Sequence, residues 1–415
     1  MNRKSFFVGA FGALSQYYDH HLFGFLAASI SRSFTPSEDP VIALLNTYFI
    51  MAIAVLAKPV GALFLGRIGD IYGRSATLKI SLIGTSCASF LISITPGYHY
   101  LGIISALILL IARMSIVALV SSGTDGVRLY VYEHIGKSRQ CLGTGLVTCS
   151  ALAGSFVAST SAWFFTLGFM PGYAWRFAFL VGTILGLTML LIVSKYKESD
   201  LAHHKEDPKY DDYLKKSTFR IVKENWLLFL LCAILAGAIG STNHFCVIFF
   251  GTYAFKVLGY VDHSTMQFYT SVGIVLYMLA AIVAGFLADM IGRRSVATFG
   301  FIALVFCTIS ILFGIKDGYI SLPSYCAMMI ALPILTMPAL ALLKQSIPTI
   351  IRYRIFSLAH AIGSICISSP TPFFSTLIYE TTEVSWAPLL YFISTIVTII
   401  AAIYILCFKY RANQH

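Results

Sequence analysis

The stretch GRIGDIYGR, Gly66 to Arg74, places an Asp and two Arg between two long apolar segments of the chain. A second version, GFLADMIGRR, runs from Gly285 to Arg294, and its Asp289 follows Asp70 by 219 residues. In both copies a Gly precedes the Asp by four residues, so the two lie one turn apart on the same face of a helix. A chain that writes this charged hairpin twice is predicted to consist of two similar halves.

Apolar segments fill most of the remaining sequence. Of the 415 residues, 58% are hydrophobic and only 11% are charged, whereas soluble domains carry about 25% charged residues. Segments of about 20 apolar residues, the length needed to cross a bilayer, occur twelve times. They are residues 6–31, 43–66, 76–95, 99–121, 142–168, 176–194, 226–251, 269–288, 296–315, 319–343, 355–379 and 385–408. We predict an all-α integral membrane protein with twelve transmembrane helices.

Lys and Arg residues gather in alternate loops between these segments. The net charge is +11, and most of the basic residues fall on one side if the N-terminus is inside. This asymmetry follows the positive-inside rule, so both termini are predicted to be cytoplasmic. The basic charge is then an orientation signal, and we expect no nucleic-acid partner. We expect a multi-pass protein in the lipid bilayer of a plasma membrane, the bacterial inner membrane.

One polar segment divides the twelve apolar segments six and six. We expect an N-terminal six-helix bundle (1–194), a cytoplasmic linker (195–225) and a C-terminal six-helix bundle (226–415). Each charged hairpin follows the second apolar segment of its half, so the two bundles are predicted to be parallel repeats. Parallel repeats that meet at a midplane cavity are a common plan of transporters.

Sequence motifs of enzymes and cofactor sites are missing. The chain contains no P-loop, no GxGxxG after a strand and no GxSxG elbow. Its nine Cys include no CxxC pair and no His/Cys cluster at metal-ligand spacing. We therefore expect no enzymatic activity, no cofactor and no metal site.

The two hairpins predict a conformational latch on the cytoplasmic side. An Asp there can accept hydrogen bonds from the positive N-terminus of a neighbouring helix, and a Gly one turn away lets that helix approach. Simple positive-inside anchoring would account for the Arg residues but not for the Asp or the Gly spacing. We assign the latch to Gly66, Asp70, Gly73, Arg74, Asp125, Arg128, Gly285, Asp289, Gly292 and Arg293.

At these hairpins the chain resembles the major facilitator superfamily, whose loop motif is G-x-x-x-D-[RK]-x-G-[RK]-[RK]. Both copies match at Gly, Asp, Gly and the first Arg, and depart at Ile71 and Met290. Other stretches resemble its metabolite:H⁺ symporter family, which includes proline/betaine, α-ketoglutarate and citrate carriers. These stretches are QYYDHHLFG (16–24), KPVG (58–61), GYAWRFAFLVG (172–182) and IPTIIRY (347–353). The resemblance implies the major facilitator fold and secondary transport.

Some positions depart from the pattern of that family. Gln16 stands where the family usually has Glu, Gly123 stands where it has a second Glu, and His360 replaces an Asn. Arg113, in the fourth apolar segment, matches the family. Because two family carboxylates are absent, proton coupling does not follow from the resemblance alone.

Charged residues within the apolar segments are few. Asp19 is the one acid near the middle of a predicted span, and Arg113 and Lys58 lie at comparable depths. An unpaired charge at the bilayer centre costs about 2.5–3.5 kcal/mol, so Asp19 is expected to face a polar cavity and pair with Arg113 or Lys58. Burial favours the neutral acid and a cation favours the ionised form. We assign proton coupling to Asp19 and Arg113; the alternative is a static ion pair.

Other polar and aromatic residues in the spans are candidates for contact with a substrate. Aromatic rings can stack on a quaternary ammonium, and amide or imidazole groups can form hydrogen bonds, although such residues more often serve packing. The predicted substrate cavity comprises Tyr17, Tyr18, Lys58, Asn243, His244 and His360. If Asp19 does not carry the proton, His20, His21 or His360 is the next candidate.

The sequence therefore predicts a secondary active transporter that acts as a monomer. We expect proton-coupled uptake of a small polar metabolite, either a proline/betaine-like osmolyte or a small carboxylate, by alternating access. An uncoupled facilitator or exchanger is the alternative, because Gln16 and Gly123 remove carboxylates. A membrane sensor or scaffold is a further alternative.

Overall fold

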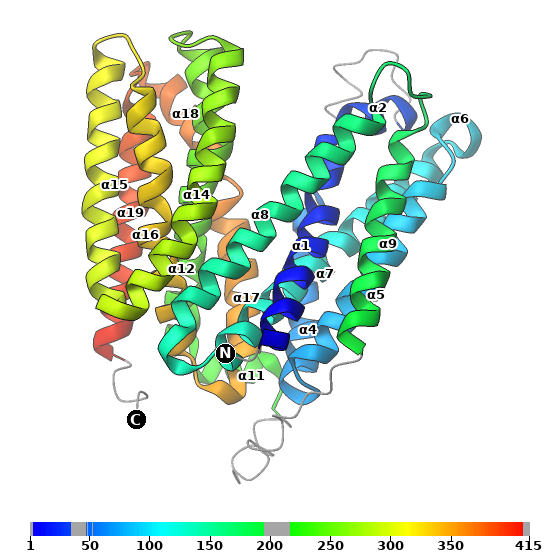
Figure 1. The fold of residues 1–415 in the computed structure, drawn as a ribbon, viewed down its shortest axis with the longest axis horizontal. Helices are drawn as coiled ribbons and strands as arrows, with labels where there is room; N and C mark the ends of the chain where they lie inside the picture. Colours follow the sequence, from blue (N-terminus) through cyan, green and yellow to red (C-terminus); the bar gives the residue numbers. More distant parts are fainter. Residues whose placement is uncertain (1–2, 35–46, 48, 52, 195–215, 410–415) are drawn as a thin grey trace. The chain divides into compact units, whose positions relative to one another are not determined.

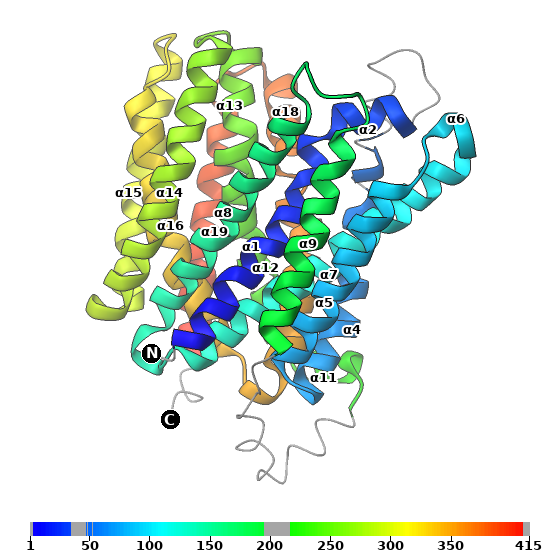
Figure 2. The same cartoon turned by 45° about the vertical axis from the view of Figure 1, so that its right-hand side comes forward.

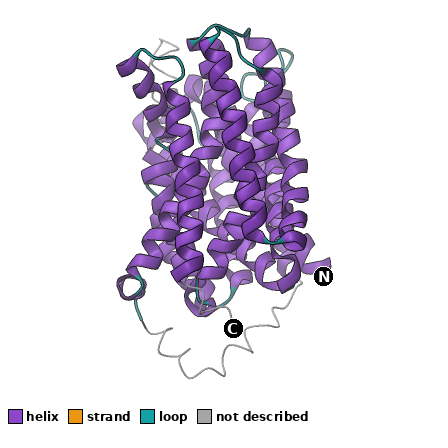
Figure 3. Cartoon of the chain, turned by 90° about the vertical axis from the view of Figure 1, so that its left-hand side faces the viewer, coloured by secondary structure: helices purple, strands orange, loops and turns teal. Residues whose placement is uncertain are grey.

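The computed structural model describes residues 3–34, 47, 49–51, 53–194 and 216–409. Nearly all of them are helical, and none of these residues forms a strand (Figures 1 and 3). Eleven helices in this part of the chain are long and apolar enough to cross a membrane. The expected first span, 6–31, also forms helices, but the polar residues between Ser15 and His21 lower its mean hydropathy below that of the other eleven.

The described residues divide into two compact units. Those within Met1–Val131 and Ser150–Thr218 form the first, and those within Tyr132–Cys149 and Phe219–His415 form the second. The expected bundles were 1–194 and 226–415. Residues 132–149, which fall within the first expected bundle, lie in the second unit. Residues 195–215 of the expected linker (195–225) lie outside the described residues. Near its end, the linker forms α11 (Thr218–Glu224).

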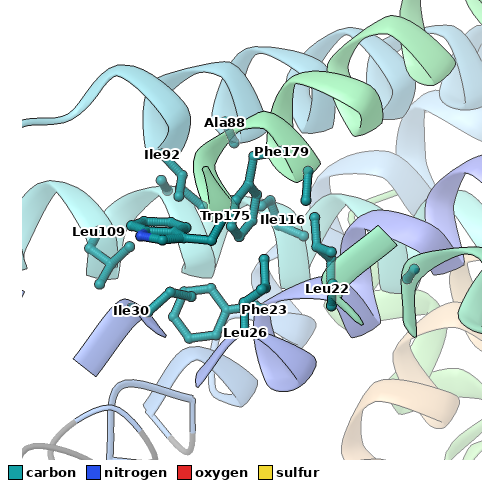
Figure 4. Close-up of a cluster of buried hydrophobic side chains, with 14 of the residues drawn as sticks. Leu22, Phe23, Leu26, Ile30, Ala88, Ile92, Leu109, Ile116, Trp175 and Phe179 are labelled. Atoms are coloured by element: carbon teal, nitrogen blue, oxygen red, sulfur yellow. The ribbon is translucent and has the colours of Figure 1, made fainter. Parts of the chain in front are cut away.

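The first unit contains the first six spans. Its elements are α1 (Arg3–Phe25), α2 (Ala27–Phe34), α4 (Lys58–Ile71), α5 (Arg74–Ile94), α6 (Tyr98–Leu101), most of α7 (Ile103–His134), the later part of α8 (Gln140–Phe165) and α9 (Trp175–Ser194). Side chains of α1, α2, α5, α7 and α9 meet in one apolar cluster (Figure 4). The residues labelled there are Leu22, Phe23, Leu26, Ile30, Ala88, Ile92, Leu109, Ile116, Trp175 and Phe179.

The second unit contains the other six spans and three π-helical segments. Its elements are η1 (Lys137–Arg139), α12 (Trp226–Asn243), η3 (His244–Phe249), α13 (Phe250–Thr252), η4 (Tyr253–Val257), α14 (His263–Ile291), α15 (Arg293–Lys316), α16 (Leu322–Ser346), η5 (Thr349–Ile351), α17 (Arg352–Gly363), η6 (Ser364–Ser368), α18 (Thr371–Thr382) and α19 (Ala387–Lys409). The π-helical segments are η3, η4 and η6. Helices α14, α15 and α16 pack side by side (Figure 2).

Local sequence signals determine where several helices begin. The side chain of Asp262 caps α14 by accepting a hydrogen bond from the Thr265 N–H at 2.9 Å, which satisfies a donor that the first helical turn leaves unpaired. Helix α4 carries Pro59 in its first turn, where the missing N–H has no cost. Gly73 and Gly292 turn the chain between consecutive helices at φ of 94° and 116°, a region that favours glycine.

Candidate functional site

The second charged hairpin joins α14 to α15 and contacts the start of α8 within the second unit. The backbone N–H groups of Cys141 and Leu142 donate to the two carboxylate oxygens of Asp289 at 3.0 and 2.8 Å. These groups lie in the first turn of a 26-residue helix, where donors lack intrahelical partners and the dipole is positive. A Cβ atom on Gly285 would lie 2.5 Å from the Cys141 carbonyl oxygen, so glycine is needed for this approach. The Gly–Asp spacing therefore serves helix contact.

Arg293, in α15, extends the contact to α16 and to the first residue of α8. Its Nη1 donates to Gln345 Oε1 at 2.7 Å, and its Nη2 donates to Gln140 Oε1 at 2.8 Å. Gly292, directly before it, has the positive φ that places α15 beside the end of α14. One local contact, between this hairpin and the start of α8, thus involves four of the predicted latch residues: Gly285, Asp289, Gly292 and Arg293.

A buried lysine lies near the same contact. Lys344 is fully buried in α16, donates to Thr144 Oγ1 at 2.8 Å and lies 5.0 Å from the centre of the Tyr132 ring. Arg352 donates to Glu133 Oε1 at 2.9 Å beside it. The sequence did not single out Lys344, because it follows the expected span 319–343 directly and reads as a loop cation. A basic residue at the very end of an apolar segment is the only signal it leaves.

The first charged hairpin differs from the second in how its Arg is used. Arg74 Nη1 donates to Asp70 Oδ1 at 2.8 Å and to the Gly69 carbonyl oxygen at 2.6 Å. The Asp70 carboxylate is buried together with Gly66 on α4. This ion pair therefore lies within the hairpin itself, whereas Arg293 binds two glutamines.

The pair Asp125–Arg128 lies on α7 in the first unit. Arg128 Nη1 lies 3.1 Å from Asp125 Oδ1, and its Nη2 donates to the Tyr17 hydroxyl at 2.6 Å. Arg128 therefore connects the carboxylate on α7 to an aromatic residue on α1. Tyr17, expected at the substrate cavity, is half-buried.

Asp19 is fully buried in α1, on the side that faces α5 and α9. Ser89 donates from Oγ to Asp19 Oδ1 at 2.7 Å, while no described residue forms a hydrogen bond with Oδ2. A Cβ atom on Gly182 of α9 would overlap Oδ1, so glycine makes the space for the carboxylate. The expectation that Asp19 faces a polar cavity differs from this packed environment between helices of one unit.

Arg113 does not form the expected direct pair with Asp19. It is 4% exposed on α7, lies 4.8 Å from the centre of the Phe23 ring, and donates from Nη1 to the His20 carbonyl oxygen at 3.0 Å. Among the described residues no ion pair or hydrogen bond joins it to Asp19, although the two charges interact electrostatically. Sequence spacing gave their common depth but not the direction of each side chain. Lys58 interacts electrostatically with Asp125.

Gln16 and Gly123, the two positions without the expected family carboxylates, are neighbours in space. Gln16 donates from Nε2 to Ser81 Oγ at 2.8 Å, and a Cβ atom on Gly123 would lie 2.5 Å from that same nitrogen. Ser81 and Ser89, which hold Gln16 and Asp19, escaped sequence reasoning. Hydroxyl residues at every fourth position of α5 are the signal that could have found them. They are Thr77, Ser81, Thr85, Ser89 and Ser93, and all are buried.

The remaining residues predicted for the substrate cavity have different environments. Tyr18 is fully buried in the apolar cluster and donates its hydroxyl to the Ala178 carbonyl at 2.9 Å, so it serves packing. Asn243 and His244 lie half-buried where α12 continues into η3. His360 is half-buried on α17 and stacks on Phe356 at 6.1 Å between ring centres. In the described part of the chain, no three His, Cys, Asp or Glu side chains gather as they would around a metal ion.

Known proteins resemble the chain along most of its length. A model of the Major Facilitator Superfamily matches residues 9–368. A putative proline/betaine transporter of Staphylococcus haemolyticus is 28% identical over 401 residues, covering 94% of this chain and 84% of that protein. The proline/betaine transporter of Escherichia coli K12 is 26% identical over 428 residues, covering 99% and 84%. These relatives confirm the resemblance to proline/betaine transporters.

Solved structures show the same fold. The proton:xylose symporter XylE bound to 6-bromo-6-deoxy-D-glucose has a TM-score of 0.75 at 14% identity, covering 98% of this chain and 95% of that chain. The Escherichia coli fucose:proton symporter FucP has a TM-score of 0.73 at 11% identity, covering 97% and 98%. The likeness confirms the expected fold.

Proposed function

We infer, since the chain belongs to the Major Facilitator Superfamily, that it is a secondary active transporter that couples uptake of a small polar metabolite to protons. The substrate is a proline/betaine-like osmolyte or a small carboxylate, carried by alternating access. The names of the sequence relatives support the osmolyte class. We place the protein in the bacterial inner membrane as a monomer with both termini cytoplasmic, and we assign it no enzymatic activity.

The environment of Asp19 is the observation that supports the proposal of proton coupling. One carboxylate oxygen accepts from Ser89 and the other has no hydrogen-bond partner among the described residues. A fully buried ionised carboxylate is costly without a paired charge, and Arg113 acts on it only through space. A protonated Asp19 removes that cost, so small movements of α1 against α5 or α7 can load or release a proton.

An uncoupled facilitator or exchanger is the second candidate. The contact between Gln16, Ser81 and Gly123 favours it, because neutral groups occupy both positions where the family usually carries Glu. In such a protein Asp19 and Arg113 would be fixed charges that stabilise the first unit.

Uptake by purified protein in proteoliposomes separates the two candidates. Labelled L-proline, glycine betaine and citrate are offered with and without an acidic exterior, and a protonophore dissipates the gradient in a parallel sample. Accumulation above the external concentration that requires the gradient supports coupling. Equilibration of substrate at the same rate with and without the gradient supports the facilitator and contradicts proton-driven uptake.

A further inference from the structure

Two glycines of α9 make space for polar side chains of α1 and α5 within the first unit (Figures 1 and 2). Gly182 and Gly186 are four residues apart, so they lie on the same face of α9. A Cβ atom on Gly182 would overlap Asp19 Oδ1, and one on Gly186 would overlap Ser86 Oγ. One glycine therefore accommodates an oxygen from α1, and the other, one turn further along, accommodates an oxygen from α5.

Three buried oxygen atoms at this interface have no hydrogen-bond partner among the described residues. They are Ser15 Oγ, Asp19 Oδ2 and Ser86 Oγ, and none of the three residues is more than 3% exposed. Hydroxyl groups within helices commonly bond to the carbonyl oxygen one turn earlier, as Thr85 and Thr183 do in the same helices. Because a buried polar group without a partner is unfavourable, three of them at one interface indicate a bound molecule.

The directions of the helices bring these three oxygens toward one place. Helices α1 and α5 run in the same direction and α9 runs in the opposite direction. Ser15 precedes Asp19 by four residues, and Ser86 precedes Ser89, the donor to Asp19, by three. Gly186 is the later of the two glycines on the antiparallel helix. Ser15, Ser86 and Gly186 are therefore displaced from Asp19 toward the same end of the unit, by about one turn or 5.4 Å.

The rotation of α1 directs Ser15 toward the same space. Tyr18 donates its hydroxyl to the Ala178 carbonyl of α9, and Asp19 contacts both α5 and α9. At about 100° per residue, Ser15 lies between these two directions, roughly 60° from Tyr18 and 40° from Asp19. Its hydroxyl group therefore belongs to the interface with α5 and α9.

A water molecule fits the chemistry of the three oxygens. A buried water typically makes about three hydrogen bonds to polar groups that are otherwise unsatisfied. Serine hydroxyls can donate or accept, so one water can donate to an ionised Asp19 carboxylate or accept from a protonated one while Ser15 and Ser86 rotate to match. A sodium ion suits the space less well, because the positive charge of Arg113 already acts on Asp19 through space.

We propose that Ser15 and Ser86 are positioning residues that hold a water molecule on Asp19 Oδ2, and that this water exchanges the proton of the carboxyl group. On release, the O–H bond of the protonated carboxyl breaks and its proton bonds to the water oxygen. The hydronium ion formed exchanges with water outside the interface when α9 moves away from α1, and loading reverses these steps. The role in proton exchange rests on the transport function proposed above, whereas the bound water does not.

Infrared spectroscopy tests the bound water without any substrate. Full-length protein in lipid nanodiscs is compared between acidic and alkaline buffers, in H₂O and in H₂¹⁸O. The difference spectrum should contain a water O–H band that shifts in H₂¹⁸O and is lost in Asp19→Asn and in the double variant Ser15→Ala/Ser86→Ala. Ser105→Ala is the matched control and should keep the band, because this buried Ser of α7 donates to the Gly102 carbonyl at 2.7 Å. No such band in the unmodified protein, or an unchanged band in the double variant, would overturn the proposal.

A second variant fills the space without a clash. Gly186→Ala alone would overlap Ser86 Oγ, whereas the Ser86 Cβ atom lies 3.5 Å from the added methyl group, an ordinary contact. The double variant Ser86→Ala/Gly186→Ala should therefore keep the unfolding temperature of Ser86→Ala in detergent and lack the water band. A folded protein of this kind that retains the band would place the water elsewhere and contradict the assignment.

Uptake into proteoliposomes tests the exchange of the proton. Ser15→Ala and Ser86→Ala should each slow gradient-driven uptake of L-proline or glycine betaine about 2- to 10-fold, the factor for one neutral hydrogen bond. Counterflow, which requires no proton release, should be unchanged. The ratio of uptake rates in H₂O and D₂O should rise in both variants, because proton transfer then limits the rate.

Two results of this uptake experiment would contradict the proposal. Equal slowing of uptake and counterflow with an unchanged isotope ratio would show that the serines serve packing alone. Uptake that requires Na⁺ and not an acidic exterior would assign the space to a cation. If neither compound is transported, the osmolyte class of the proposed function fails, while the infrared measurement still decides whether water is bound.

Discussion

At the scale of single residues, Asp19 shows how burial and incomplete hydrogen bonding bear on function. Its carboxylate has one hydroxyl donor, Ser89, and a guanidinium that interacts with it only through space. A hydrogen bond to a charged group contributes about 1.5–3 kcal/mol, which does not offset the desolvation of a fully buried carboxylate. The neutral and ionised states are therefore closer in free energy than in a tight ion pair, as a reversible proton site requires.

Asp19→Asn removes the titrating group and keeps its shape. We expect accumulation against a gradient to be lost, because the amide cannot release a proton, while exchange of internal for external substrate persists. Counterflow and gradient-driven uptake in the same proteoliposomes measure the two activities. Asp317→Asn, an exposed acid directly after α15, is the matched control and should keep both. An Asp19→Asn protein that still concentrates substrate would transfer the assignment to a histidine.

Gly182→Ala tests the packing that holds the carboxylate. The new methyl group would overlap Asp19 Oδ1, so the carboxylate or α9 must move; overpacking of this kind costs about 1–3 kcal/mol. We expect a lower unfolding temperature in detergent and loss of gradient-driven accumulation. Gly168→Ala is the control, since nothing lies within 4 Å of the added atom there. Unchanged accumulation by the Gly182→Ala protein would show that the position of the carboxylate is not critical.

The sequence singled out candidate residues more readily than it predicted what they contact. Asp19 and Arg113 stood out because charges in apolar segments are rare, and their common depth followed from residue counting. The directions of the side chains depend on helix rotation, which the weak amphipathicity of membrane helices does not reveal. Tyr18 was therefore predicted at the substrate cavity, whereas it packs into the apolar cluster. Ser89, which donates to Asp19, was overlooked because a buried Ser resembles any other small residue in such a helix.

At the scale of elements, the charged hairpins were the most predictable part of the chain. The four-residue spacing and the chemistry of Asp indicated a helix N-terminus as the partner, and the start of α8 is the N-terminus that Asp289 contacts. Which helix it would be is a tertiary property that no local pattern encodes. The π-helical segments were also invisible, because an inserted residue leaves the apolar composition of a span unchanged.

Asp289→Asn weakens the contact between α14 and α8. An amide supplies one acceptor where the carboxylate supplies two, and it lacks the charge that interacts with the helix dipole, typically about 0.3–1 kcal/mol. We expect slower turnover with nearly unchanged substrate affinity, because a conformational contact is altered and not a binding group. Asp262→Asn, at the opposite end of α14, keeps a capping side chain and should behave like the unmodified protein. Equal losses of affinity and turnover in Asp289→Asn would argue against a latch.

At the scale of the whole molecule, composition and charge distribution were sufficient to predict most of the fold. The length and number of apolar segments, their division by one polar segment and the repeated hairpin led to the expected fold, which the solved structures confirm. The first span is instructive, because the polar residues that suggest a site in α1 also lower its hydropathy. A strictly hydropathic count therefore misses the helix that carries Asp19.

Membrane orientation is the remaining property of the whole molecule that the charges predict. Reporters fused after His415 and inserted at Gly318, in the exposed turn between α15 and α16, should lie on opposite sides of the membrane, because α16, α17 and α19 separate them by three spans. We expect a fluorescent protein to be active only at His415 and alkaline phosphatase only at Gly318, since the Lys and Arg bias keeps the C-terminus inside. Replacing Arg293 and Arg294 should not invert the topology, because the bias is summed over many loops. Phosphatase activity after His415 would contradict the predicted orientation, and with it the assignment of both hairpins to the cytoplasmic side.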